Sequence, residues 1–230
     1  MKRKNISASV VIAAAGNSTR MGKNTNKQFL MFDRKPILAH TLLAFSALPE
    51  ITEMIVVTRK DDILTVQDMI KDFSIPKVKA VLPGGTTRQE SVFLGLKHVQ
   101  EDRVLIHDGA RPFVTGEEIR SLLLELNTCS AVALGVPVKD TVKRVSKDGL
   151  VTETLPREEL WQIQTPQGFA TAEILSAHQK AVMDGVLATD DCALAEYIDI
   201  PVRIVPGSYR NIKITTPEDL VLAEAFTKEQ

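Results

Sequence analysis

The chain has 230 residues, of which 44% are hydrophobic and 25% are charged, and its mean hydropathy is -0.00. These values are typical of a globular protein and exclude the collagen-like, coiled-coil and disordered classes. Its 28 Lys and Arg residues against 29 Asp and Glu residues give a net charge of -1, so we expect neither nucleic acid nor a membrane as a partner. No linker interrupts the chain, and we expect a single domain over residues 1–230.

Cysteine usage and the start of the chain predict a cytoplasmic protein. Cys129 and Cys192 stand far apart, which argues against a disulfide framework or a structural zinc site and suits a reducing compartment. A basic start is followed by an apolar run over residues 10–15 that is too short for a signal peptide. No stretch approaches the ~20 apolar residues of a membrane span.

Short β-branched runs alternate with longer amphipathic runs along the chain. Strands are predicted over residues 8–14, 54–58, 78–82, 103–107, 131–137 and 202–205. Several are apolar at successive positions, which is typical of strands that are covered on both faces. Their alternation with helices predicts an α/β fold, a single Rossmann-like, mostly parallel sheet with flanking helices.

Start signals mark the helices between these strands. Pro36 is expected at the first position of a helix, where its missing N–H costs nothing. Three more starts are predicted from an N-cap residue followed by an acidic residue or a proline: Thr87 with Glu90, Thr115 with Glu118, and Thr216 with Pro217.

Residues 139–156 break this alternation. Two alternating segments flank Asp148-Gly149, so the stretch predicts a β-hairpin. It offers few large apolar residues for a core, and we expect a protruding arm that lies on the surface or packs on another subunit.

The loop after the first strand carries the strongest functional signal. It is rich in small residues and glycine, and Arg20 and Lys27 are among its cations. Its glycine spacing is one residue too long for a Walker A loop, and Ser18 stands at the second glycine of a dinucleotide fingerprint. The backbone N–H groups of such a loop can wrap anionic oxygens. The alternative is a flexible, solvated loop.

Three other signals lie after strands or before the last helix. Gly84-Gly85 lets a ligand approach the backbone, and Asp108 with Arg111 places a carboxylate near a guanidinium. Lys213 lies between two isoleucines. Each also has an ordinary explanation, namely a turn, a surface ion pair and an exposed lysine. The first two share the carboxyl edge of a parallel sheet with Gly16, which is where α/β proteins bind ligands. The cations and glycines indicate a polyphosphate.

Other common chemistries lack their residue patterns. The sequence has no GxSxG motif, and its four histidines do not have zinc-ligand spacing. Asp190-Asp191 is either a metal-binding pair or the first turn of a helix that begins near Thr189.

Several motifs occur in order from about residue 10 to about residue 220. They are AAAG at 13–16, RMG at 20–22, KQF at 27–29, HDGARP at 107–112, KDTVKR at 139–144, WQIQTPQ at 161–167, ATDD at 188–191 and GSYRNIKIT at 207–215. The first loop and HDGARP resemble nucleotidyltransferases that activate small phosphates with CTP. The whole set resembles the 2-C-methyl-D-erythritol 4-phosphate cytidylyltransferase family.

The resemblance implies transfer of CMP from CTP to 2-C-methyl-D-erythritol 4-phosphate with release of pyrophosphate, for isoprenoid precursor biosynthesis. By position, it makes Arg20 and Lys27 contacts to the CTP phosphates and Lys213 a second cation at the α-phosphate. It assigns Ala14, Ala15, Gly16, Gly85 and Ser91 to the cytidine pocket, and Asp108, Arg111, Thr141, Arg157, Thr165 and Thr189 to the methylerythritol phosphate. It also implies Mg²⁺, held mainly by the CTP phosphates, with Asp108 touching either the metal or a substrate hydroxyl.

The resemblance further implies a homodimer in which the hairpin arm brings Thr141 to the partner's acceptor site. Two alternatives remain open, a ribitol 5-phosphate cytidylyltransferase and a catalytically silent nucleotide-binding module. The KDTVKR motif disfavours the first, and the retained Arg20, Lys27 and Lys213 argue against the second. Ser18, Asn26 and Gly109 depart from the usual glycine, proline and alanine of the family. None of these departures removes a charge, so we expect altered loop stiffness and not lost activity.

Overall fold

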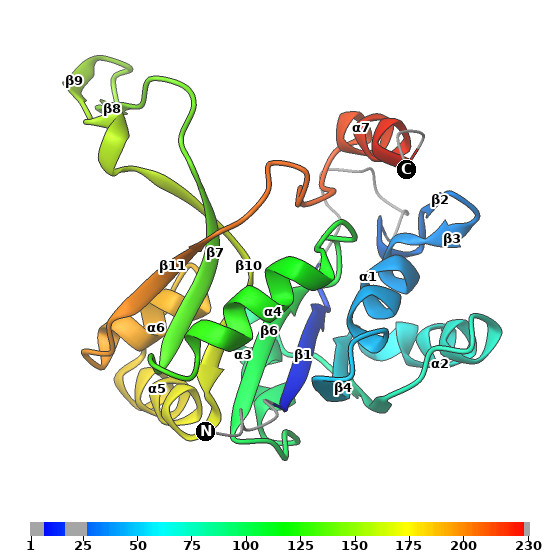
Figure 1. Cartoon of the computed structure of the whole chain (residues 1–230). Helices are drawn as coiled ribbons and strands as arrows, with labels where there is room; N and C mark the ends of the chain where they lie inside the picture. The colour runs from blue at the N-terminus through cyan, green and yellow to red at the C-terminus, as the bar shows by residue number, and fades with distance from the viewer. Residues whose placement is uncertain (1–6, 17–26, 228–230) are drawn as a thin grey trace.

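A computed structural model describes residues 7–16 and 27–227 of the chain (Figure 1). Its centre is one sheet of seven strands in the order β11-β7-β10-β6-β1-β4-β5. The strands are β1 (Ala8–Ala14), β4 (Ile51–Thr58), β5 (Val78–Pro83), β6 (Arg103–Asp108), β7 (Ala131–Pro137), β10 (Trp161–Ala170) and β11 (Val202–Pro206). Strand β10 runs antiparallel to β6 and β7, and the other pairings are parallel. The predicted mostly parallel sheet is confirmed.

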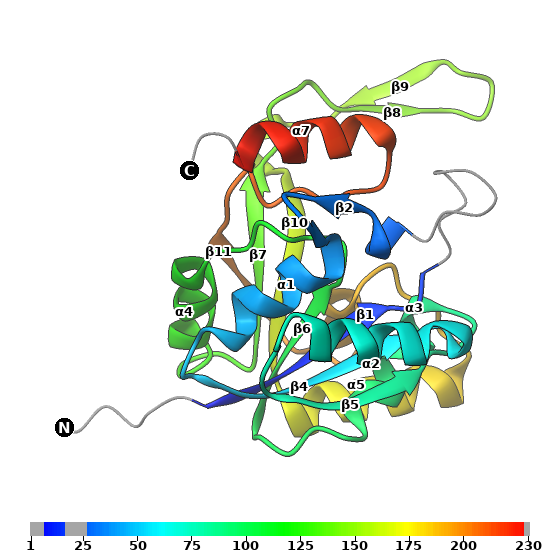
Figure 2. The ribbon, with the colours of Figure 1, turned by 90° about the vertical axis from the view of Figure 1, so that its right-hand side faces the viewer.

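Helices cover both faces of this sheet (Figure 2). One face packs against α1 (Ile37–Ser46), α2 (Ile63–Asp72) and α4 (Gly116–Glu125), and the other against α3 (Arg88–Leu96), α5 (Thr171–Asp184) and α6 (Asp191–Tyr197). Alternate residues of β1 serve the two cores, since Val10 and Ile12 lie in the first and Val11 in the second. This explains why the strand sequences are apolar at successive positions.

A smaller unit lies beside the carboxyl edge of the sheet. It contains the short strands β2 (Met31–Phe32) and β3 (Lys35–Pro36), the last helix α7 (Pro217–Thr227), and a third apolar cluster that includes Phe32 and Ile214. The short helices η2 (Lys27–Phe29) and η3 (Lys60–Asp62) follow β1 and β4 in the chain. The carboxyl ends of the parallel strands point toward the side on which α7 and the hairpin lie (Figure 1).

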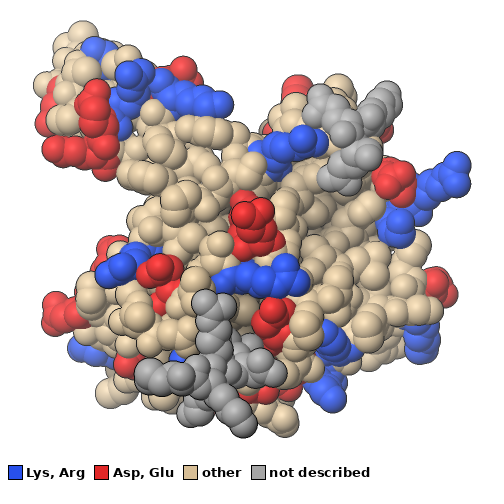
Figure 3. All heavy atoms as spheres, in the orientation of Figure 1, with Lys and Arg blue, Asp and Glu red and all other residues tan. Residues whose placement is uncertain are grey.

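The predicted hairpin is confirmed. Strands β8 (Lys143–Val145) and β9 (Val151–Thr154) form a separate antiparallel pair, followed by η4 (Arg157–Glu159). Gly149 lies in its turn with φ of 82°, a left-handed conformation that favours glycine. The arm stands away from the rest of the chain, and its surface mixes acidic and basic side chains (Figure 3).

The strand predictions hold: two strands have the predicted bounds, and four are longer at one end by one to three residues. Strand β10 was not among them, because Pro166 and Gly168 interrupt its pattern. The structure accommodates the proline at an irregularity, since the ladder between β10 and β7 shifts between Ile163 and Gln167. A proline has no N–H to donate and is tolerated in a strand at such places.

Two helix starts differ from prediction in detail. Pro36 is not the first helical residue but the N-cap of α1, with an extended ψ of 148°, because it pairs with Met31 in the β2–β3 hairpin. Thr87 caps α3, while the carboxylate of Glu90 accepts hydrogen bonds from the N–H and hydroxyl of Thr86. Thr115 forms the predicted capping box of α4 with Glu118.

No helix within the described parts of the chain combines the length and apolar character that crossing a membrane requires.

Candidate active site

A cavity of about 510 Å³ lies at the carboxyl edge of β1, β4, β5 and β6. Loops from all four strands line it, together with the segment that precedes α7. The lining residues are Ala13, Ala15, Gly16, Gln28, Arg59, Lys60, Gly84, Gly85, Thr86, Thr87, Arg88, Ser91, Asp108, Ala110 and Lys213. The cavity therefore brings together Gly16, Gly84-Gly85 and Asp108, which the sequence placed after three different strands.

The wall after β5 is built by backbone and small side chains. The N–H of Gly85 donates to Oγ of Ser91 over 3.1 Å, and that hydroxyl donates to the carbonyl of Thr87 over 2.8 Å. A Cβ on Gly84 would meet Ala15 and would lie 2.8 Å from Oγ of Ser91. Only a glycine lets this backbone lie so close to the first loop.

Asp108 is the electrostatic centre of the cavity wall. Its Oδ2 lies 2.7 Å from Nζ of Lys213, and its Oδ1 lies 3.1 Å from Nε of Arg88. Nε of Arg111 is 3.8 Å from Oδ2. Burial alone would raise the pKa of Asp108, but Arg88, Lys213 and Arg111 hold it well below its usual range. The carboxylate therefore stays ionised at neutral pH.

Lys213 reaches this position because its segment is attached to the loop after β6. The N–H of Ile214 donates to the carbonyl of Ala110 over 2.9 Å, and Nη1 of Arg111 donates to the carbonyl of Asn211 over 2.7 Å. Ile214 is fully buried. The alternating apolar residues around Lys213 thus anchor it, as the sequence suggested, beside the carboxyl edge of the sheet.

His107 holds the loop after β6 through both of its ring nitrogens. Its Nε2 lies 3.0 Å from the carbonyl of Arg111, so Nε2 is the donor nitrogen, and Nδ1 accepts from the hydroxyl of Thr165 at 3.1 Å. That hydroxyl in turn accepts from the N–H of Asp108 at 3.1 Å. Burial lowers the pKa of His107 to about 4, against a smaller upward effect of the Arg111 carbonyl. The imidazole is therefore neutral at pH 7.

The first loop is only partly described. Gly16 lines the cavity, whereas the carbonyl of Ala14 accepts a hydrogen bond from the side chain of Gln28. Arg20 lies outside the described residues. Lys27 begins η2, but its side chain also lies outside the described part.

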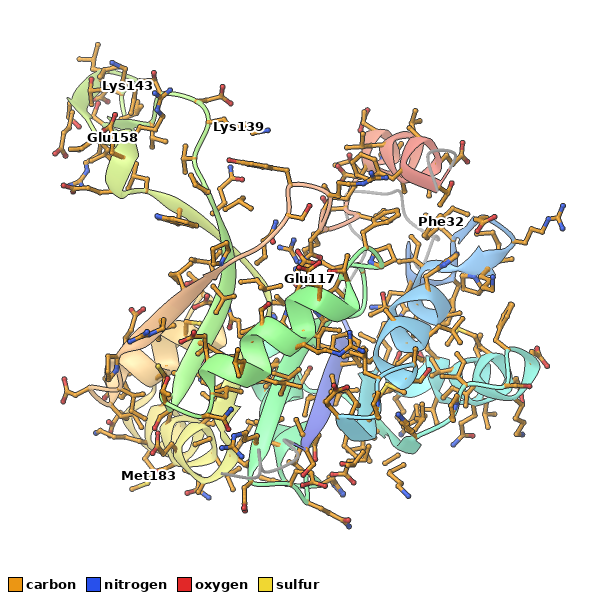
Figure 4. All side chains as sticks on the ribbon, viewed as in Figure 1. Phe32, Glu117, Lys139, Lys143, Glu158 and Met183 are labelled. Carbon is orange, nitrogen blue, oxygen red and sulfur yellow. The ribbon has the colours of Figure 1, made fainter. Side chains whose placement is uncertain are left out.

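The residues that the resemblance assigned to the acceptor are spread over several elements. Thr165 is buried in β10, and Thr189 is exposed in the loop before α6. Thr141 and Arg157 are exposed on the arm and do not line the cavity. Figure 4 shows Lys139 where the chain enters the arm, and Lys143 and Glu158 farther out on it. Within one copy of the chain, the arm residues are thus separate from the cavity.

Sequence reasoning missed Arg88, which links Asp108 to a second buried carboxylate. Besides Asp108, it contacts Asp191, with 2.7 Å between its Nη1 and Oδ2 of the carboxylate. Burial would lower the pKa of Arg88, but the charges of Asp191 and Asp108 raise it above its usual value. A signal was available, because Arg88 is the first residue of α3 and a cation is unfavourable at a helix N-terminus. Arg59 and Lys60, after β4, were also missed.

The described residues of the site do not form a metal-binding cluster. Within residues 7–16 and 27–227, no three or more His, Cys, Asp or Glu side chains are arranged to hold one. Asp108 faces three cations, so it does not fit a metal ligand in this arrangement. Asp190 caps α6 by accepting from the N–H of Ala193, and Asp191 pairs with Arg88. Of the two interpretations of Asp190-Asp191, the first turn of a helix is therefore the one that the structure shows.

The sequence matches the family described as 2-C-methyl-D-erythritol 4-phosphate cytidylyltransferase over residues 8–229. A relative of that name from Halalkalibacterium halodurans is 50% identical over 223 residues, which cover 96% of this chain and 97% of the relative. One from Desulforamulus reducens is 49% identical over 223 residues, which cover 96% and 95%.

Solved structures resemble the fold over the same extent. That of 4-diphosphocytidyl-2C-methyl-D-erythritol synthase from Anaerococcus prevotii has a TM-score of 0.86 at 34% identity and covers 98% of this chain and 100% of its own. That of 2-C-methyl-D-erythritol 4-phosphate cytidylyltransferase from Thermus thermophilus has a TM-score of 0.79 at 33% identity and covers 97% and 100%.

Proposed function

Because this chain belongs to the 2-C-methyl-D-erythritol 4-phosphate cytidylyltransferase family, we propose that the cavity at the carboxyl edge of its sheet is the site of the family's reaction. The chain transfers CMP from CTP to 2-C-methyl-D-erythritol 4-phosphate. The products are 4-diphosphocytidyl-2-C-methyl-D-erythritol and pyrophosphate, in isoprenoid precursor biosynthesis. The relatives carry the methylerythritol name, so neither the ribitol phosphate enzyme nor the silent binding module is retained.

The observation that carries this placement is the charge of the cavity lining. Among the described lining residues, Arg59, Lys60, Arg88 and Lys213 are basic and only Asp108 is acidic. The reaction brings a phosphate monoester to a triphosphate, and fixed cations offset the repulsion between these anions. Arg88 is paired with two carboxylates, Asp108 and Asp191, so we assign this role to the other three cations, beside the glycine-rich backbone.

The chain needs no nucleophile of its own. A phosphate oxygen of the acceptor attacks the α-phosphorus of CTP, the bond from that phosphorus to the bridging oxygen breaks, and pyrophosphate leaves with the electron pair. The cysteines do not suit a covalent step, because burial raises the pKa of Cys192 well above its usual value and Cys129 lies near the opposite edge of the sheet. Positioning and charge stabilisation therefore carry the catalysis.

We assign the two ends of the cavity to the two substrates. Gly84-Gly85 and Ser91 would face the cytidine, with Ala14, Ala15 and Gly16 across from them. Lys213 would contact the α-phosphate, and Arg20 and Lys27 of the first loop would contact the phosphates from the other side. The acceptor would lie over Asp108 and Arg111, near Thr165 and Thr189.

Mg²⁺ is proposed as a cofactor that arrives on CTP. Bound to phosphate oxygens, it would neutralise charge on the leaving pyrophosphate. The described residues offer it no cluster of ligands, so the triphosphate itself would hold it. The roles assigned to Lys213 and Asp108 do not depend on it.

We also propose a cytoplasmic homodimer. The arm of one copy would bring Thr141 and Arg157 to the acceptor site of the other. Exposed apolar side chains on the arm, Val145, Leu150 and Val151, support a partner surface.

To test this function, purified protein is incubated with Mg²⁺, CTP and one polyol phosphate at a time. Pyrophosphate release and the mass of the nucleotide product are then measured. We expect release with methylerythritol 4-phosphate and little with ribitol 5-phosphate. Equal release with both acceptors, or release without any acceptor, would contradict the assignment.

A further inference from the structure

The first turn of α3 connects the wall of the cavity to the loop that carries Thr189. Arg88 and Gln89 follow Thr87 directly, so they continue the segment that lines the cavity. Nε2 of Gln89 donates to the carbonyl of Val186 over 3.1 Å, and Oε1 of the same amide accepts from the N–H of Ala188 at 3.0 Å. One side chain thus holds the loop by both ends of its amide.

Arg88 holds the end of the same loop by charge. It lies between two buried carboxylates, with 2.7 Å from Nη1 to Oδ2 of Asp191 and 3.1 Å from Nε to Oδ1 of Asp108. The two carboxylates come from different elements, α6 and β6. A rigid, planar guanidinium can span both at once, which a lysine ammonium cannot do with the same geometry.

Asp191 is itself held in place by neighbouring side chains. Nε2 of the buried His178 lies 3.2 Å from its Oδ1, and the ring of His178 stacks on Phe93 of α3 with 5.7 Å between ring centroids. Gln167 of β10 adds a second amide clamp, because it donates to Asp190 and accepts from the N–H of Asp191. Asp191, the partner of Arg88 on α6, is therefore part of the packed core.

We propose that the first turn of α3 holds the nucleotide cavity and the Thr189 loop in fixed relation, with Arg88 and Gln89 as positioning residues for the transfer. The inference rests on the proposed placement of CTP and acceptor. Arg88 acts through Asp108, whose other oxygen holds Lys213. Gln89 acts through the backbone on either side of Leu187, two residues before Thr189.

The expected effects follow from the geometry of the reacting centres. A displacement of about 1 Å at a reacting group lowers turnover by up to about a hundredfold. Loss of the Arg88 contacts removes one of the three cations that hold Asp108, the partner of Lys213, so it should lower kcat. Loss of the Gln89 contacts frees only the Thr189 loop, so it should raise the KM for the acceptor and leave the affinity for CTP unchanged.

The first experiment compares Arg88→Met and Arg88→Lys with Arg120→Met. Arg120 forms a more exposed ion pair with Glu50, 3.1 Å away, and does not line the cavity, so it controls for the loss of an arginine pair elsewhere. We expect Arg88→Met to lower kcat at least tenfold with the dissociation constant of CTP, measured by calorimetry, within about threefold of wild type. Arg88→Lys should recover part of the loss. A weakened CTP affinity with kcat retained would make Arg88 a nucleotide ligand and overturn the proposal.

The second experiment uses Gln89→Met, with Gln179→Met on the exposed face of α5 as control. Hydrogen exchange at the N–H of Ala188 should become faster in Gln89→Met only, and the acceptor KM should rise about tenfold. Faster exchange with an unchanged acceptor KM would show that the clamp is structural and would overturn the role of Gln89. If wild type releases no pyrophosphate, the proposed function fails, while unchanged exchange would contradict the clamp independently.

A double-mutant cycle tests whether Arg88 acts through Asp191. Arg88→Met, Asp191→Asn and the double variant are compared by kcat/KM and by melting temperature. Residues in one ion-pair network give non-additive effects, so the double variant should be little worse than the worse single variant. Additive losses in kcat/KM would refute the linked role. If the melting temperatures are non-additive but none of the variants changes kcat/KM, the network only stabilises the fold.

Discussion

The ammonium group of Lys213 lies 2.7 Å from Oδ2 of Asp108, and the guanidinium of Arg88 lies 3.1 Å from the other oxygen. One buried carboxylate therefore fixes two cations at the cavity wall. Lys213 keeps 37% of its side chain exposed, so it faces the cavity as well as its partner. A cation held in advance of the reaction needs little reorganisation when charge develops on the phosphorus.

Replacing Lys213 with alanine should therefore remove turnover and leave the fold intact. We expect kcat to fall by about a hundredfold or more, as for other lost transition-state donors. Steady-state pyrophosphate release measures the effect, and circular dichroism checks the fold. The resemblance places Lys27 at the same phosphates, and we expect the same result for Lys27→Ala.

Lys180→Ala is the matched control. Nζ of Lys180 lies 2.6 Å from Oδ2 of Asp184 in an exposed pair on α5, so the substitution removes a similar ion pair away from the cavity. It should leave kcat within about twofold of wild type, since exposed pairs contribute little. Near-normal turnover in Lys213→Ala would remove that residue from the mechanism.

We expect selectivity for CTP over UTP from the backbone near Gly84-Gly85. A carbonyl that accepts from the cytosine amino group would face another acceptor if uracil entered, and an unpaired buried acceptor is costly. The ratio of kcat/KM for CTP and UTP should exceed about a hundredfold. Comparable values for the two nucleotides would contradict backbone reading of the base.

Gly84→Ala probes the same wall. The added Cβ would meet Ala15 and lie 2.8 Å from Oγ of Ser91, so the cavity wall must shift. Overpacking of this kind costs about 1–3 kcal/mol, and we expect CTP to bind about tenfold more weakly in calorimetry. Unchanged CTP affinity in a folded variant would place the nucleotide elsewhere.

The sequence predicted the sheet and the edge at which the site lies, because strand patterns and the loops after them are local features. Gly16, Gly84-Gly85 and Asp108 could be placed at one edge without knowing the order of the strands. The position of Lys213 could be predicted from its two isoleucine neighbours, which were expected to hold it in place. These signals depend on residues close together in the chain.

The contacts of Arg88 could not be predicted in the same way. Its two carboxylate partners are 20 and 103 residues away in sequence, and only the packing of α3 against the elements that carry them brings the three together. Strand β10 was missed for a related reason, since its place between β6 and β7 is set by tertiary pairing that overrides its local propensity.

His107 should make the stability of the fold depend on pH. Burial lowers its pKa to about 4 from an ordinary 6.5, so between these values the unfolded chain binds a proton that the folded chain does not. The free energy of unfolding should therefore decrease as pH falls through this window. The shift corresponds to about 3 kcal/mol at most.

Denaturant unfolding of wild type and His107→Gln at pH 7 and pH 4.5 measures this contribution. The stability advantage of wild type over the variant should shrink as the pH falls. His98→Gln serves as control, because His98 is exposed. An advantage that is constant with pH would show that His107 does not carry the proton linkage.

The arm should make the protein a dimer. Its three exposed apolar side chains, Val145, Leu150 and Val151, are 51%, 70% and 60% exposed, and an isolated two-stranded hairpin is marginally stable in water. Tyr209 steadies the base of the arm, because its hydroxyl donates to the carbonyl of Pro137 over 2.7 Å. Replacing residues 142–153 with a short Gly-Ser turn should give a folded monomer with little activity, and sedimentation of a fully active wild-type monomer would refute the dimer.

Mixing two inactive variants tests whether the arm serves its partner. Thr141→Ala alters the arm and Lys213→Ala alters the cavity, so a mixed dimer would hold one site with an intact cavity and an intact partner arm. Random pairing should restore about a quarter of wild-type activity, because half of the dimers are mixed and each has one working site of two. If each arm served its own subunit, every site in the mixture would carry one defect, and activity would stay at the level of the separate variants. The control mixes Thr141→Ala with a Lys213→Ala variant that also carries Thr141→Ala. This pair can still form mixed dimers but holds no intact arm, so the recovery should be lost.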